Sequence, residues 1–127
     1  MITLGYKCLI KVLCVVCVGL LTLYGCLFWK YGWLKIRVAS AYEQTQIFDE
    51  MRTQALQSGT ADAAGFLEYV IGYYPSETKQ EKGSQLDRIV ERERSFAVRD
   101  ILAYLRSKTG DDLGENPAAW IQKYAKR

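Results

Sequence analysis

The first quarter of the chain contains one long apolar run, and the remainder alternates apolar and polar positions with the period of helices. Residues 12–29 read VLCVVCVGLLTLYGCLFW, which is 18 residues without a charged side chain. A helix rises about 1.5 Å per residue, so this run covers roughly 27 Å, close to the hydrocarbon thickness of a bilayer. The pattern predicts a transmembrane helix over residues 12–29, after a short tail of residues 1–11.

Basic and aromatic residues flank the run in the way that membrane anchors require. The basic ones are Lys7 and Lys11 before it and Lys30, Lys35 and Arg37 after it, and the rings of Phe28, Trp29, Tyr31 and Trp33 gather at its C-terminal end. Amphipathic rings favour the headgroup layer. Positive charge is nearly equal on the two sides, but a short N-terminal tail often stays cytoplasmic. We therefore expect a single-pass protein whose domain lies outside the cytoplasm.

Bulky aromatic residues follow the run where a signal peptidase needs small ones, so we expect an uncleaved signal-anchor. The tetrapeptide from Leu23 to Cys26 resembles the lipobox of bacterial lipoproteins, in which the cysteine is lipidated. Tyr24 stands where that family prefers a small residue, and the chain after Cys26 stays apolar. A lipoprotein lipidated at Cys26, with a helical domain outside the cytoplasm, is thus the alternative interpretation.

Helical periodicity continues beyond the run, in a juxtamembrane segment, residues 30–58, and a small domain, residues 60–127. An amphipathic helix is predicted over residues 34–57. Its apolar positions are Ala41, Ile47, Phe48, Met51 and Ala55. A second helix is predicted to start at Thr60 as the N-cap and to stop before Pro75. Its predicted buried face consists of Leu67, Val70, Ile71 and Tyr74.

The third and fourth predicted helices have the clearest ends. The third begins after Ser84, an N-cap residue, and stops at Gly110. Its apolar stripe comprises Leu86, Val90, Ala97, Ile101 and Tyr104, widened by Ile89 and Leu105. The fourth has Asn116 as N-cap and Pro117 at its first position. Because it has only two turns, we expect it to dock on the third helix, with Trp120 buried near Ile101 and Leu105.

The composition excludes several kinds of catalytic and metal-binding site. The chain contains no histidine, which excludes a Ser-His-Asp arrangement and the commonest metal ligand. Its four cysteines lie in or beside the apolar run, at positions 8, 14, 17 and 26, and one helix cannot gather four such side chains around an ion. We therefore expect no catalytic residues, no metal and no cofactor.

Charge is balanced from Lys30 onward, where 15 Lys and Arg face 14 Asp and Glu, a net charge of 15 − 14 = +1. Arginines gather on one side of the third predicted helix, but carboxylates are interleaved with them, so we expect a solvated face and no nucleic-acid binding. These arginines are Arg88, Arg92, Arg99 and Arg106. Glu93 lies at the edge of the apolar stripe and is either an acid of raised pKa or, as we expect, the partner of an Arg or Lys.

Tyr73 and Tyr74 precede Pro75 and have two interpretations. They form a binding ledge, or they close the core at the end of the second helix, as apolar periodicity usually means. The candidate interaction surface is therefore Tyr73, Tyr74, Arg88, Arg92 and Arg99.

The segment LRSKTGDDLGENPAAW, residues 105–120, resembles the closing motif L-x-x-x-T-G-x-D-x-G-x-x-x-x-x-W of bacterial HEAT-like helical-repeat proteins. The preceding block from residue 73 is similar to that of small bacterial membrane-anchored proteins that end in the same way. The resemblance implies a helix that ends at Gly110, a short helix with a buried Trp120, and a module used for binding. A solenoid needs about three or more repeats, so at most one repeat-like unit is present.

Together these features predict an all-α protein, with an N-terminal transmembrane helix followed by a small three- to four-helix, HEAT-like bundle. We expect a non-enzymatic protein-interaction or scaffolding module whose partners are the lipid bilayer and another protein. An accessory subunit of a membrane enzyme is a further alternative.

Overall fold

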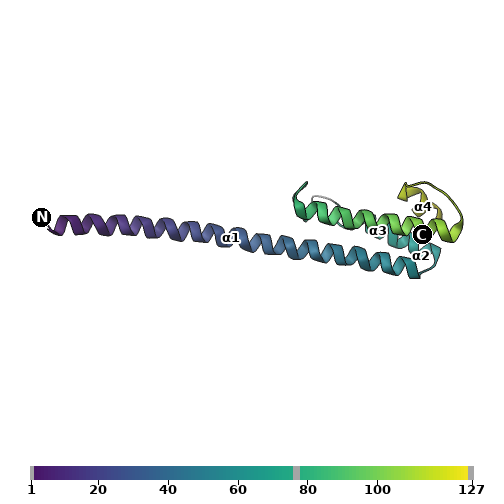
Figure 1. Cartoon of the computed structure of the whole chain (residues 1–127), viewed down its shortest axis with the longest axis horizontal. Coiled ribbons are helices and arrows are strands. Elements are labelled where there is room, and N and C mark those ends of the chain that lie inside the picture. The colour runs from purple at the N-terminus through teal and green to yellow at the C-terminus, as the bar shows by residue number, and fades with distance from the viewer. Residues whose placement is uncertain (1, 76–77, 126–127) are drawn as a thin grey trace. The chain divides into compact units, whose positions relative to one another are not determined.

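The computed structural model describes residues 2–75 and 78–125, and these ranges form an all-α structure without a strand (Figure 1). The helices are α1 (Ile2–Gln57), α2 (Thr60–Gly72), α3 (Gln85–Thr109) and α4 (Pro117–Tyr124). The predicted fold class, a long apolar N-terminal helix and a small helical bundle, is confirmed. The chain divides into two compact units, Met1–Ile36 and Arg37–Arg127.

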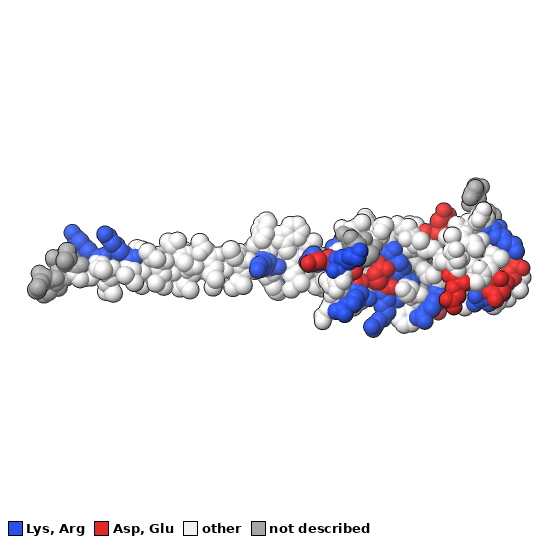
Figure 2. All heavy atoms as spheres, turned by 90° about the horizontal axis from the view of Figure 1, so that it is seen from above, with Lys and Arg blue, Asp and Glu red and all other residues white. Residues whose placement is uncertain are grey.

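The first unit belongs to one helix that is long enough and apolar enough to cross a membrane. Every side chain described between residues 5 and 36 is exposed, including the four cysteines. Figure 2 shows basic side chains near the N-terminal end of this helix, followed by a long stretch without blue or red atoms. The helix continues through Gly32 without a break, since α1 extends to Gln57.

The second unit packs four helical segments around one hydrophobic core. The core residues are Ala41, Phe48 and Ala55 from α1; Ala63, Leu67 and Val70 from α2; Val90, Ala97, Ile101, Leu102 and Leu105 from α3; and Trp120 from α4. Two polar contacts tie the last turns of α1 and the residue that follows it to α3. Arg52 forms an ion pair with Asp100 at 3.2 Å, and the Tyr104 hydroxyl donates to the Ser58 carbonyl at 2.5 Å.

The caps predicted for α3 and α4 are confirmed. The Ser84 hydroxyl accepts a hydrogen bond from the Asp87 amide at 3.2 Å, and Gly110 ends α3 in the left-handed conformation with φ 73°. The Asn116 side chain accepts from the Ala118 amide at 3.1 Å, and Pro117 opens α4. Each of these caps satisfies or replaces a helix-end backbone group that has no partner within the helix.

Two expectations for α2 are wrong. Gly59 is the N-cap, and Thr60 is the first helical residue without a side-chain cap bond. Leu67 and Val70 are fully buried as predicted, but Ile71 is 38% exposed and Tyr74 is 42% exposed. Ile71 lies about 100° beyond Val70 around the helix, on the solvent side. Tyr74 falls outside α2 because the helix ends at Gly72.

Two expectations for α3 and α4 also need correction. Leu105 is fully buried, but Ile89 is 54% exposed and does not widen the stripe. Trp120 is fully buried as predicted, yet α4 packs mainly against α2 and only secondarily against α3. Gly110 and Gly114 both adopt positive φ and turn the connecting loop. The Trp120 indole N–H then donates to the Gly114 carbonyl at 2.9 Å, which fixes the ring against that loop.

Replacing Trp120 by alanine should strongly destabilise the second unit, because truncating a large buried ring costs about 3–5 kcal/mol. We expect the melting temperature of a chain lacking residues 1–33 to fall by roughly 12 °C or more, measured by circular dichroism. Arg99→Ala, a change at an exposed position, should cost under about 0.5 kcal/mol. In that shortened chain Trp120 is the remaining tryptophan, so its fluorescence should report a buried ring that becomes exposed on melting. Equal melting of the alanine variant and the parent would contradict the packing.

Asp111 connects the loop to the last turn of α4 and should make stability pH-dependent. Its carboxylate accepts hydrogen bonds from the Lys123 ammonium and the Tyr124 hydroxyl, which hold the pKa of Asp111 below its usual value of 3.8. A carboxyl whose pKa is lowered by folding stabilises the protein above its unfolded pKa and loses that effect as the pH falls through its folded pKa. The urea midpoint of Asp111→Asn should therefore lie below that of the parent at pH 6, and the two should converge below about pH 4. A difference that persists unchanged at pH 2.5 would contradict this assignment.

Candidate functional site

Three tyrosine rings form an exposed aromatic surface at the C-terminal end of α2, called here the tyrosine shelf: Tyr69, Tyr73 and Tyr74. The ring centroids of Tyr69 and Tyr73 are 5.3 Å apart in a stacked arrangement, and those of Tyr73 and Tyr74 are 4.7 Å apart, edge to face. Tyr69 is 47% exposed and Tyr74 is 42% exposed. With Gly72 and Pro75, the rings line a mainly apolar hollow of about 540 Å³.

Tyr73 anchors the shelf to the core. Its ring is half-buried and meets the fully buried Phe48 edge to face, with centroids 6.0 Å apart. Burial, followed by the nearby Glu43 carboxylate, raises the pKa of the Tyr73 hydroxyl above 10.0. The hydroxyl therefore stays neutral at physiological pH. Tyr73 thus closes the core, while Tyr74 faces solvent, and the binding ledge stays a prediction.

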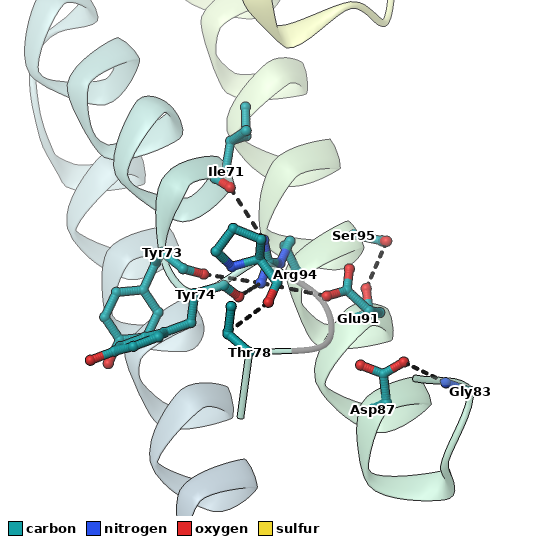
Figure 3. Close-up of polar contacts among 10 residues, drawn as sticks. Ile71, Tyr73, Tyr74, Thr78, Gly83, Asp87, Glu91, Arg94 and Ser95 are labelled. Atoms are coloured by element: carbon teal, nitrogen blue, oxygen red, sulfur yellow. Dashed lines mark hydrogen bonds and ion pairs between the residues drawn. The ribbon is translucent and has the colours of Figure 1, made fainter. Parts of the chain in front are cut away.

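Arg94 of α3 holds the backbone beneath the shelf (Figure 3). Its guanidinium donates to the carbonyls of Ile71, Tyr73 and Tyr74 at 3.2, 3.0 and 2.5 Å. The last carbonyls of a helix have no intrahelical donor, and the planar guanidinium presents several N–H groups in a fixed fork. Arg94 therefore supplies the donors that α2 lacks at its end.

The Arg94 side chain is only 12% exposed and lies against Phe48 of α1 and Glu91 of α3. The guanidinium carbon lies 5.1 Å from the centroid of the Phe48 ring, and Glu91 forms an ion pair with it at 3.4 Å. A buried charge is costly unless it is paired and hydrogen-bonded, and here both conditions are met. Arg94 belongs to no motif or basic row in the sequence, although it falls among the apolar positions of α3.

Tyr74 adopts φ 39°, a left-handed conformation that L residues with a side chain rarely occupy. Such strain of about 1–3 kcal/mol persists when the surrounding contacts impose it. Arg94 binds the Tyr74 carbonyl, and the Lys79 ammonium lies 3.8 Å from the centroid of the Tyr74 ring. Lys79 also lies 3.9 Å from the Glu43 carboxylate. The exposed ring is thus held in place by its backbone and by a cation.

The predicted arginine row separates into two groups. Arg88, Arg92 and Arg99 are exposed on α3 and form no ion pair with a described residue, whereas Arg106 pairs with Asp112 at 3.1 Å. Glu93 is half-buried, and none of the Arg and Lys side chains that the structure describes is the expected ion-pair partner. Its incomplete burial leaves the carboxylate within reach of water. No described contact joins the three exposed arginines to the tyrosine shelf.

The described residues contain no group of three or more His, Cys, Asp or Glu side chains placed to hold a metal ion. Comparison of the chain with families of known proteins, with curated proteins and with solved structures finds no match. The resemblance of residues 105–120 to a HEAT-like repeat ending therefore stays a prediction.

Arg94→Gln should destabilise the second unit by about 2–3 kcal/mol, because hydrogen bonds to charged groups contribute about 1.5–3 kcal/mol and the carbonyls lose their donors. Hydrogen exchange of the amides of the last turn of α2 should accelerate more than that of the middle of α3. Arg92→Gln, an exposed neighbour on the same helix, is the matched control and should leave both quantities nearly unchanged. If the two variants unfold at the same denaturant concentration, Arg94 does not hold the shelf.

Proposed function

We propose that the protein is a single-pass, membrane-anchored interaction module that is not an enzyme and that presents the tyrosine shelf to a protein partner. The observation that carries the proposal is the exposed Tyr74 ring, held at a strained backbone position by the buried Arg94. Strained residues that the surrounding structure imposes cluster at functional sites. Exposed, rigid tyrosines are typical of protein interfaces because they bury much area at little entropic cost.

The anchor is the apolar part of α1, residues 12–29, and we propose that it is retained as a signal-anchor with the domain outside the cytoplasm. Its length, its lack of charge and the full exposure of its side chains support this role. A helix that is hydrophobic all round needs a protein core or lipid around it. A partner bound at the shelf would then be concentrated at the membrane.

Membrane anchoring is tested by extraction of isolated membranes. The protein should stay in the pellet after alkaline carbonate and dissolve in detergent, because a transmembrane helix is not held by charge. Intact-mass analysis should show the unprocessed chain. A mass that corresponds to a lipidated chain starting at Cys26 would replace the signal-anchor by the lipoprotein alternative, and release by carbonate would reject both.

The shelf is tested by photocrosslinking in intact membranes. A photoreactive phenylalanine analogue at position 69 or 74 should give one discrete protein adduct, and the same group at the exposed Gln57 should not. Arg94→Gln combined with the probe at position 74 should reduce the adduct, since the ring loses its fixed position. Equal labelling from the shelf and from Gln57 would contradict the proposed surface.

A further inference from the structure

The solvent-facing side of α3 carries a second surface, called here the arginine stripe: Arg88, Ile89, Arg92, Phe96, Arg99 and Ala103. At 100° per residue these positions fall within a sector of about 100°, so they form one continuous band along the helix. All six are exposed, and the exposed fractions of the two large apolar side chains are 54% for Ile89 and 42% for Phe96. The Arg99 guanidinium carbon lies 4.7 Å from the centroid of the Phe96 ring. Basic and apolar side chains are thus combined on one face.

The charge of this stripe is not neutralised by the described part of the domain. The other arginines of the domain that the structure describes have carboxylate partners, as Arg52 has in Asp100. Arg88, Arg92 and Arg99 have none among the described residues. Two carboxylates border the stripe, but Asp100 is engaged by Arg52, and only Glu93 is unengaged. The face therefore carries an excess of positive charge beside two exposed apolar side chains.

The N-terminal end of the stripe lies at the edge of the second unit where that unit begins. The Gln80 side-chain amide donates to the Arg37 carbonyl at 3.0 Å, and Glu81 forms an ion pair with Arg37 at 3.3 Å. Ser84 then caps α3, one turn before Arg88. Arg37 follows Trp29 by eight residues, which span at most about 28 Å when fully extended. The tether between the apolar run and the second unit is therefore short.

We infer that the arginine stripe binds the anionic phospholipid surface of the membrane that holds the protein. Guanidinium groups match phosphate oxygens in geometry and charge, and Ile89 and Phe96 supply the apolar side chains that enter the headgroup boundary. The tether keeps the domain within reach of that surface, so a weak contact suffices. The inference rests on the proposed membrane anchoring, and it assigns to the arginines a ligand separate from the protein partner of the shelf.

The experiment uses the full chain, with its four cysteines replaced by alanine and a single environment-sensitive fluorophore (NBD) attached at Ala103→Cys. The protein is placed in vesicles of phosphatidylcholine alone or with added phosphatidylglycerol. Emission from position 103 should shift to the blue and increase with the anionic lipid, and high salt should reverse the change because it screens the phosphates. The same label at the exposed Thr53 of α1 is the control and should not respond.

Two triple variants test whether the fluorescence response depends on the positive charge of the stripe. Arg88→Gln, Arg92→Gln and Arg99→Gln together should abolish the difference between the two lipid compositions, and the corresponding lysine variant should retain most of it. Equal emission in both compositions, or an unchanged response in the glutamine variant, would overturn the inference. An acidic protein partner for this stripe would give that lipid-independent result.

Flotation with neutral vesicles distinguishes failure of the anchor from failure of the stripe. The parent and the glutamine variant should both float, because the anchor does not depend on charge. Loss of flotation for both would reject the anchoring proposal. In that case, flotation of the parent with anionic vesicles alone, together with loss of this flotation in the glutamine variant, would still support binding of the arginine stripe to anionic lipid.

Discussion

The buried Arg94 guanidinium is the contact on which the arrangement of the domain depends. One side chain from α3 binds the carbonyls of Ile71, Tyr73 and Tyr74 at the end of α2 and lies against Phe48 of α1. Hydrophobic burial brings helices together but does not set where a helix stops. Pro75 limits how far α2 can extend, and the guanidinium holds the carbonyls of the turn that follows the helix. The Arg94 side chain therefore contributes both to the packing of the helices and to the geometry of the shelf.

This arrangement has a cost that the rest of the domain must offset. Tyr74 is held at positive φ, and two large tyrosine rings remain exposed in a domain whose core is small. A domain of this size retains only several kcal/mol of net stability, so strain of about 1–3 kcal/mol is a substantial part of it. Trp120 contributes in the opposite direction, since it is the largest fully buried side chain. The core at α4 thus offsets the strain at the end of α2.

Local signals in the sequence predicted both ends of α3 and the start of α4, whereas tertiary contacts decided which border residues are buried. The caps at Ser84, Gly110 and Asn116 depend on neighbouring residues alone, and all three are as expected. Periodicity placed Ile71 and Ile89 in the core, but both are exposed. Whether an apolar residue at the border of a stripe is buried depends on where the neighbouring helices pack, which the sequence does not show. The docking of α4 on α2 follows from the loop between the two left-handed glycines, which no periodic pattern describes.

The sequence does contain a pattern that identifies Arg94, namely a charged residue within the apolar stripe of α3. At 100° per residue it lies among the buried positions of α3, on the same side as Val90 and Leu105, and an arginine there needs a buried acceptor. A search for basic rows selects Arg88, Arg92 and Arg99 because they lie together on the polar side. A search for a charge within an apolar stripe selects Arg94. The row on the polar side is a surface available to a ligand. The arginine within the apolar stripe makes the contact that holds the fold. The angular position on α3 therefore distinguishes the two classes of arginine.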